Sequence, residues 1–504
     1  MTGTSTTGAG RRWAAAVVVC SGVFLLGMDF TVLNVAIPDL QRDLAPSLSQ
    51  VQWVVDGYAL VLGGTVLATG AVTDRIGRRR AFITGLALCG ATAACGALAA
   101  QPWQVIAARG GMGAGAALLM PATLSIITTL FPEPALRRRA IAGWAAAAGV
   151  GGMTGPIVGG WLVELFSWRA GFWATVPAAA AGIVTALLVV PESHAPRATR
   201  VDALGVVLSA AGLVALVWAI IESPGRGWTD TSVLAGYVVA VVLLTAFAAW
   251  QVRARHPMLP PALLRRPRLG MAALALAMTS FGLYGALFVV TLHLQGVLEY
   301  SPWEAGLRTL PLAIALTAGA GAALPLLSRH GERPPILVGL GIVSAAFIAL
   351  STTDADSGYP HVLLFQLVAG FGAGLVATAG TETVMAATPA DRAALGSAIN
   401  DTTRQIGACL GVAVQGSILA AASTAHLPVD TSLLDTWTRA EHLPEPLRTR
   451  SLGDAREAFI DGMTSAVTVA AAVTIAAAAL VWRFLPPTAR PRPRTPAHQD
   501  DTAR

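Results

Sequence analysis

Charged residues are scarce in this sequence. Asp, Glu, Lys and Arg together make up 12% of the 504 residues, whereas ordinary soluble domains contain roughly one quarter. Hydrophobic residues make up 54%, and lysine is absent, so every basic residue other than histidine is an arginine. This composition excludes an ordinary soluble domain and indicates a membrane protein.

The missing lysine and the few cysteines exclude several function classes. The glycine clusters have no Walker lysine, which removes the usual ATP-driven motor. The four cysteines all fall in apolar segments, so neither a disulfide framework nor a thiol metal site is indicated. No clustered metal ligands and no nucleophile–base set are evident. We therefore expect no enzyme activity, no metal and no cofactor.

Long uncharged segments dominate what remains. Residues 203–221 carry no charge and are about as long as the roughly 20 residues that a membrane-spanning helix needs. Apolar segments of this length predict an all-α membrane protein with fourteen transmembrane helices. They lie at residues 13–37, 51–72, 81–100, 103–129, 140–165, 171–190, 203–221, 233–250, 269–292, 305–327, 335–352, 362–385, 394–422 and 463–482.

Arginine is distributed unevenly among the loops. Segments such as DRIGRRR (74–80) and PEPALRRR (132–139) alternate with loops such as TTDADSGYP (352–360) that contain none. By the positive-inside rule the arginine-rich loops are cytoplasmic, which places both termini inside and requires an even number of spans. We expect a multi-pass protein of a bacterial plasma membrane. The arginines lie in short loops rather than in a basic domain, so no nucleic-acid partner is expected.

Three short matches reveal an internal repeat. GMGAGAAL (111–118) resembles GFGAGLVA (370–377), and DRIGRR (74–79) resembles SRHGER (328–333). Gly151, Gly155 and Gly160 also correspond to three later glycines at one constant offset, with a valine in place of Pro156. These matches pair spans 2 to 5 with spans 10 to 13. Parallel halves with a site at their interface are the plan of a rocker-type transporter.

The repeat predicts the domain organisation. We expect a cytoplasmic N-terminus (1–12), an N-terminal six-helix bundle (13–190), and two inserted helices with a cytoplasmic linker (191–268). A C-terminal six-helix bundle (269–484) follows, with an extracellular loop (424–458), and then a disordered cytoplasmic tail (485–504).

Five motifs together resemble one family. They are MDFTVLNVAIP (28–38), DRIGRRR (74–80), an arginine with GMGAG (109–115), GPIVGG (155–160) and RQIGACLGVAV (404–414). The chain resembles the major facilitator superfamily, specifically its fourteen-span drug:proton antiporters. The resemblance implies two six-helix bundles, efflux rather than uptake, and the proton gradient as the energy source.

The segment GGMTGPIVGGW (151–161) is a poor helix former inside an apolar span. Gly151, Gly155 and Gly159 recur every four residues and leave one helix face open to a neighbouring backbone. Pro156, which Gly160 follows one turn later, permits a kink. Ordinary close packing would explain the spacing. The resemblance implies instead the motif that marks exporters, and we hypothesise that it seals one conformation against leakage.

The short loop after span 2 carries a second motif. Gly77 provides turn freedom, and Asp74 can pair with a nearby arginine. A plain positive-inside loop would explain Arg75 and Arg78 but not Asp74 or Gly77. The resemblance implies that these four residues form a conformational latch between the halves.

Ionisable residues within spans are costly and usually functional. At about 1.5 Å per residue, Asp29, Asp56 and Arg109 all lie roughly 8–12 Å from the outer ends of their spans. We predict that they form one buried network for proton coupling, a static salt bridge being the alternative. The resemblance supports Asp29 and Arg109, whereas an acid at position 56 departs from the family's pattern.

Weaker candidates for substrate binding or coupling are also present. Glu382 lies near the inner end of span 12, and Asp401, Arg404 and Gln405 lie a few turns into span 13. Asn34, in the span 1 motif, joins this group. Arg404 and Gln405 match the family's pattern, and Asp401 is less standard.

The sequence therefore predicts a monomeric transporter that exports a small organic, amphipathic compound in exchange for protons. One alternative keeps the fold but changes the cargo to a lipid or a siderophore-like metabolite. A second alternative is a membrane sensor that has lost transport. Loss of the loop latch or of the intramembrane acids would be expected in such a sensor, and both are present.

Overall fold

The structure is a computed structural model that describes residues 5–194, 201–354, 356–388, 393–426, 436 and 444–487. Within these ranges, fourteen helical segments are long and apolar enough to span a membrane, and no strand occurs. The expected number of spans and the all-helical fold class are confirmed. The predicted tail from residue 488 onwards lies outside the described residues.

The first six helices form one bundle. They are α1 (Ser5–Leu44), α2 (Leu48–Ile76), α3 (Arg78–Ala97), α4 (Pro102–Leu130), α5 (Pro134–Leu165) and α6 (Arg169–Val189). Helix α1 packs along α5, while α4 lies between α2 and α3. The hydroxyl of Ser47 accepts a hydrogen bond from the Gln50 amide and starts α2. Gly77, with φ +100°, separates α2 from α3.

Two inserted helices follow, α7 (Ala203–Arg226) and α8 (Thr231–Arg253). Their N-termini are capped by the carboxylates of Asp202 and Asp230, which accept hydrogen bonds from backbone amides. Helix α8 packs against α7, whereas α7 also contacts α2 and α15. The short α9 (Pro261–Leu264) leads into the second bundle.

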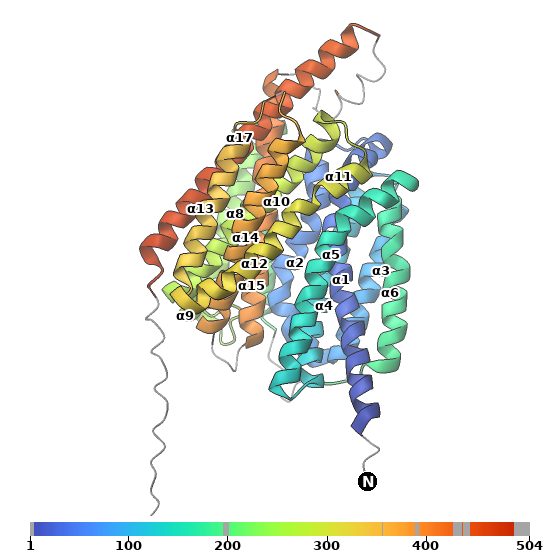
Figure 1. The fold of residues 1–504 in the computed structure, drawn as a ribbon, viewed down its shortest axis with the longest axis vertical. Coiled ribbons are helices and arrows are strands. Elements are labelled where there is room, and N and C mark those ends of the chain that lie inside the picture. The colour runs from blue at the N-terminus through green and yellow to red at the C-terminus, as the bar shows by residue number, and fades with distance from the viewer. Residues whose placement is uncertain are drawn as a thin grey trace, which may run out of the picture.

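The second bundle comprises α10 (Pro267–Leu292), the π-helix η1 (His293–Val297), α11 (Pro302–Arg308), α12 (Leu310–His330), α13 (Arg333–Leu350), α14 (Tyr359–Ala387), α15 (Ala393–His426) and α17 (Leu447–Phe484). The span predicted at 305–327 begins earlier and is interrupted at Thr309. In Figure 1 this bundle, coloured yellow to red, lies beside the blue and teal first bundle.

Helix α17 differs from the prediction. Residues 447–458 were expected in an extracellular loop but form the first turns of this helix. Its 38 residues span about 57 Å, whereas a hydrocarbon core is about 30 Å thick. The N-terminal part of α17 therefore extends past the other helices (Figure 1). Residues 427–435 and 437–443 of the predicted loop lie outside the described residues.

The internal repeat appears as repeated helix packing. A Cβ atom on Gly151 of α5 would lie 2.9 Å from the carbonyl carbon of Phe24 in α1. A Cβ atom on Gly407 of α15 would lie 2.9 Å from that of Ala277 in α10. One turn later, Gly155 and Gly411 meet the carbonyls of Met28 and Phe281. The glycines matched in the sequence therefore perform the same packing role in both halves.

The match between GMGAGAAL (111–118) and GFGAGLVA (370–377) is displaced by two residues when the helices are compared by their contacts. Gly113 of α4 faces the Tyr58 carbonyl of α2, and its counterpart by contact is Gly370, which faces the Leu312 carbonyl of α12. The sequence match had aligned Gly111 with Gly370. Glycines spaced two residues apart fit several alignments equally well, and only the neighbouring helix fixes the correct one.

The two halves meet at the end that carries the arginine-poor loops. Three sets of hydrogen bonds cross between them there. Gln52 donates to the Val412 and Ala413 carbonyls, Gln295 donates to the Val35 carbonyl, and Glu164 accepts from residues at the start of α11. Figure 1 shows α5 and α11 side by side at this junction. The outer side is therefore closed between the halves.

Candidate functional site

Asp29 lies in α1 with 1% of its surface exposed. One carboxylate oxygen, Oδ1, accepts a hydrogen bond of 2.7 Å from the Thr175 hydroxyl of α6. The other oxygen, Oδ2, is buried and has no hydrogen-bond partner. A buried carboxylate with one unsatisfied oxygen is costly when ionised, and a proton on that oxygen relieves the cost. The group is therefore suited to taking up and releasing a proton.

Arg109 of α4 lies beside this acid and is equally buried, at 1% exposed. Its Nη1 donates to the backbone oxygen of Asp29 at 3.0 Å, and its Nε donates to the Val54 oxygen at 3.1 Å. The guanidinium carbon lies 4.6 Å from the centre of the Tyr58 ring. Arg109 thus ties α1, α2 and α4 together through backbone oxygens and leaves the Asp29 carboxylate free of a direct bond to it.

Asp56 does not join this pair, contrary to the sequence prediction. An α-helix turns about 100° per residue, so Val54 and Tyr58 of α2 face α4 while Asp56 faces α15. Asp56 is 0% exposed, and neither carboxylate oxygen accepts a hydrogen bond of normal geometry. The thiol of Cys409 lies beside it. The intramembrane acids of the first half therefore occupy two separate sites.

The glycines of α5 divide between two partners. Gly151, Gly155 and Gly159 face α1, where added Cβ atoms would overlap its backbone. Gly160 faces Pro302 of α11, and the Pro156 carbonyl faces Gly306 of the same helix. The stripe thus holds α1 close, and the other two residues meet the second half at the outer junction.

Among the described residues, the side-chain hydrogen bonds and ion pairs of Asp74 and Arg78, in the loop after α2, stay within the first half. Asp74 lies 3.8 Å from the Arg78 guanidinium, which also donates to the Ser125 carbonyl and to the Thr129 hydroxyl of α4. The space beside Gly77 is filled by Glu192, which follows α6. Arg75 is exposed. Within the part of the chain that the structure describes, the four predicted latch residues lie close together in sequence, and none of them forms a hydrogen bond or ion pair with the second half.

The candidates in the second half separate into exposed and enclosed groups. Glu382 is exposed. Asp401 accepts a hydrogen bond of 3.2 Å from the Asn400 amide, whose oxygen accepts one from Thr381. Arg404 lies one turn after Asp401, and Gln405 faces Gly63 of α2. The remaining candidate, Asn34, is in the first half and is buried in α1. Within the part of the chain that the structure describes, none of these five candidate side chains forms a hydrogen bond or ion pair with Asp29 or Arg109.

Several residues that complete these sites were not singled out from the sequence. Thr175 binds Asp29, and Gln52 donates to α15. Phe30 packs edge-on against Tyr284 across the halves, with ring centres 5.1 Å apart. The sequence spacing could have identified Gln52, because this polar residue lies one helical turn before Asp56 and therefore on the same face of α2. Thr175 and Phe30 carried none, because threonine and phenylalanine are common in any span.

The chain matches the family model described as Major Facilitator Superfamily over residues 19–412. It is 32% identical to the tetracenomycin C resistance and export protein of Streptomyces glaucescens over 498 residues, which cover 94% of this chain and 91% of that protein. It is 33% identical to a puromycin resistance protein of Streptomyces alboniger, with 94% and 91% covered. A multidrug efflux pump of Mycolicibacterium smegmatis is 32% identical, with 94% and 96% covered.

Solved structures share the fold. A bacterial homologue of the human lysosomal transporter Spinster, inward-facing and occupied, superposes with a TM-score of 0.65 at 20% identity over 96% of this chain and 98% of that one. The human organic anion transporter MFSD10 superposes with a TM-score of 0.56 at 16% identity over 93% and 99%.

Proposed function

Because the chain belongs to the major facilitator superfamily, we propose that it is a proton-coupled antiporter that exports organic, amphipathic compounds across the bacterial plasma membrane by alternating access. Relatives that match it over nine tenths of their length are named for resistance, export or multidrug efflux. Efflux transport is thus supported by the relatives, and the proton coupling is the added claim.

The observation that carries the proton coupling is the state of Asp29. Its Oδ2 atom is buried and unpaired, while Oδ1 accepts only the Thr175 hydroxyl. Arg109 holds the backbone at Asp29 and joins it to α2 and α4. Gain or loss of a proton at Oδ2 would therefore change the electrostatic energy at a point where three helices meet.

We assign the steps as follows. External protons reach Asp29 or Asp56 in a state open to the outside and favour outward release of the substrate. The protons leave towards the cytoplasm after the halves reorient, with the outer contacts of the present structure re-formed. Asn34, Glu382, Asp401, Arg404 and Gln405 remain candidates for substrate contact or coupling.

Asp74, Arg75, Gly77 and Arg78 are proposed as the latch that engages the second half in the outward-open state. The contacts of Arg78 with α4 would be exchanged for contacts with the other bundle in that state. The glycines and Pro156 of α5 are proposed to seal the outer side against leakage, through the close contacts with α1 and α11.

The experiment uses the full chain in proteoliposomes with an imposed pH gradient. Puromycin, tetracenomycin C and a cephamycin form the first substrate panel, because relatives are named for them. We expect the gradient to drive accumulation of at least one compound. Asp29→Asn keeps the size and the acceptor for Thr175 but cannot ionise, so gradient-driven transport should fall to the level of empty liposomes.

Asp39→Asn is the matched control, because Asp39 is also in α1 but binds the Trp168 amide at the outer end. This variant should retain gradient-driven transport. Transport that is indifferent both to the gradient and to Asp29→Asn would refute the proton coupling.

A further inference from the structure

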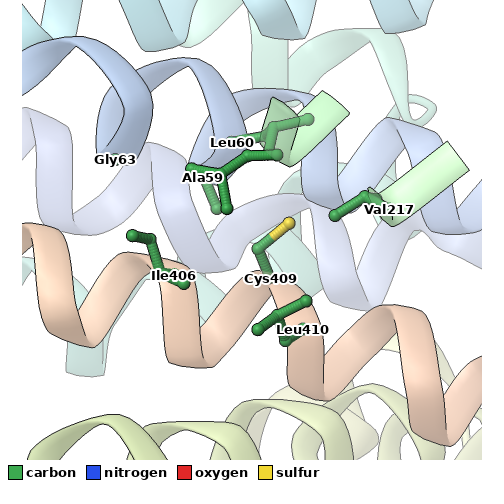
Figure 2. A pocket seen from close by; sticks show the side chains of 8 residues that line it. Ala59, Leu60, Gly63, Val217, Ile406, Cys409 and Leu410 are labelled. Atoms are coloured by element: carbon green, nitrogen blue, oxygen red, sulfur yellow. The ribbon is translucent and has the colours of Figure 1, made fainter. Parts of the chain in front are cut away.

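The inserted helix α7 lies across the line where the two halves meet. Helix α2 of the first half contacts α15 of the second, and α7 packs against both. Figure 2 shows this seam, with Ala59 and Leu60 of α2, Val217 of α7, and Ile406, Cys409 and Leu410 of α15 around one small cavity. The α2–α15 seam therefore has a third wall that belongs to neither bundle.

The contacts of α7 with the two halves are specific. On the α2 side, a Cβ atom on Gly64 would lie 3.4 Å from the Ala210 methyl group. On the α15 side, the Ser417 hydroxyl donates a 2.9 Å hydrogen bond to the Ile220 carbonyl. Between these points lies one buried apolar cluster with members from all three helices: Ala59, Leu60, Leu213, Val217, Ile221, Cys409 and Ala413.

The cavity in the seam is too apolar to hold an ordered water. It has a volume of about 10 Å³, and the side chains that line it are apolar apart from the Cys409 thiol. A buried water needs at least about 10–15 Å³ of such space and two to four polar partners. In Figure 2 the Cys409 sulfur points towards Leu60 and Val217, so it is enclosed by α2 and α7.

Asp56 sits at the edge of this dry region. It lies about one turn before Ala59 and Leu60 on α2, beside the Cys409 thiol, and neither of its oxygens accepts a hydrogen bond of normal geometry. Helix α8 lies behind α7, and residues such as Val238, Val241 and Val242 remain exposed on α8. The inserted pair thus separates the seam from the surrounding acyl chains, while the packing of α2 on α15 separates it from water.

We propose that Leu213 and Val217 of α7 are positioning residues for Asp56, which keep its carboxyl group sealed so that it exchanges protons only when α2 and α15 separate. This assignment rests on the proposed function for the role of Asp56 in coupling, but the seal itself does not depend on transport. The inserted helices thereby insulate an acid that lies directly on the interface between the moving halves.

Cys409 reports on the seal, because its side chain is enclosed in the seam and 1% exposed. The test replaces Cys20, Cys89 and Cys95 by alanine and follows alkylation of Cys409 by N-ethylmaleimide in proteoliposomes at fixed pH. The variant Leu213→Ala/Val217→Ala removes apolar volume from the third wall. We expect alkylation to be at least about tenfold faster in this variant, corresponding to ~1.4 kcal/mol in the free energy of local opening.

The matched control is Val207→Ala/Val214→Ala, on the same helix. Val207 and Val214 are 61% and 42% exposed and do not line the seam. This control should alkylate at the rate of the parent. Equal rates in both double variants, or a parent rate as high as that of the exposed Cys95 in the native chain, would overturn the seal.

A second measurement distinguishes insulation of Asp56 from simple packing. A pH-sensitive dye inside the proteoliposomes reports passive proton entry without substrate. Leu213→Ala/Val217→Ala should raise the rate of entry, and adding Asp56→Asn should return it to the parent rate, because the conducting acid is gone. A leak that persists with Asp56→Asn would refute the positioning role. Intact substrate coupling in Asp56→Asn alone would instead count against Asp56 in the proposed function and leave the seal standing.

Discussion

Individual acids in the helices of this protein differ in whether their carboxylate oxygens have hydrogen-bond partners. Asp202, at the start of α7, has both oxygens occupied: Oδ1 accepts from Gly205 and Trp250, and Oδ2 accepts from Gln251. Asp29 and Asp56 retain unpaired oxygens within the membrane-spanning helices. A carboxylate whose oxygens all have hydrogen-bond partners stabilises a fold, whereas a carboxylate with an unpaired oxygen can bind a proton or a ligand. The contrast indicates a structural role for Asp202 and supports the proposed coupling role of the other two.

Asp202 gives a pH-dependent prediction. Burial raises its pKa, but the hydrogen bonds from Trp250, Gly205, Gln251 and Met258 together lower it by more, so the pKa lies below its usual value. Its stabilising contribution is therefore complete above the unfolded pKa of about 3.9 and is lost as the pH falls through the lower folded pKa.

Amide hydrogen exchange at the first turn of α7 measures this contribution. Asp202→Ala should accelerate exchange at Gly205 and Val206 near neutral pH, and the difference from the native chain should shrink below about pH 4. Asp454→Ala, on an exposed face of α17, is the control and should leave these amides unchanged. A difference that grows on acidification would contradict the assignment.

Glycine stripes hold two pairs of helices close together, α1 with α5 and α10 with α15. In α5 the stripe facing α1 leaves no room for side chains, and the equivalent glycines of α15 do the same against α10. Without a hydrophobic driving force between helices in lipid, close packing of this kind supplies the association energy. The loss in helix propensity is thus offset by contacts between helices.

Substitutions along α5 test the stripe. Gly155→Leu would push a side chain into the Met28 carbonyl and Thr31, and overpacking of this kind costs roughly 1–3 kcal/mol or more. We expect a lower melting temperature in detergent and loss of efflux. Gly149→Leu, six residues away on the same helix, meets open space and should be tolerated. Efflux that survives Gly155→Leu would remove the sealing role of the motif.

The whole molecule consists of two bundles that hydrogen bonds hold together at the outer end. Glu164 of α5 accepts a 2.7 Å hydrogen bond from the Ser301 hydroxyl and a 3.1 Å bond from the Trp303 amide. A carboxylate of the first half therefore caps a helix of the second half. Because these bonds exist only while the outer side is closed, they bias the equilibrium between closed and open states.

Removal of the Glu164 hydrogen bonds should shift the equilibrium between the outward-closed and outward-open states. Because Glu164 is exposed, the two hydrogen bonds together contribute about 1–2 kcal/mol, and every ~1.4 kcal/mol changes the ratio of states tenfold. Spin labels at positions 166 and 354, in a cysteine-free background, would report the separation of the halves. Glu164→Ala should add a longer distance, whereas Glu222→Ala, which breaks an ion pair within α7 only, should not. Identical distance distributions in both variants would show that Glu164 does not hold the outer side closed.

The sequence by itself determined the number of spans, the family and the ionisable residues within the membrane. Apolar length, arginine bias and residue identity are local properties, and the bilayer acts on each segment separately. The tertiary structure alone decided that Asp56 faces α15 rather than Arg109, that Gly113 rather than Gly111 corresponds to Gly370, and that α7 closes the α2–α15 seam. These facts depend on how far each helix is rotated about its axis and on which neighbour it meets. In a chain rich in alanine and glycine, many rotations bury similar faces, so only the packed neighbours fix the rotation.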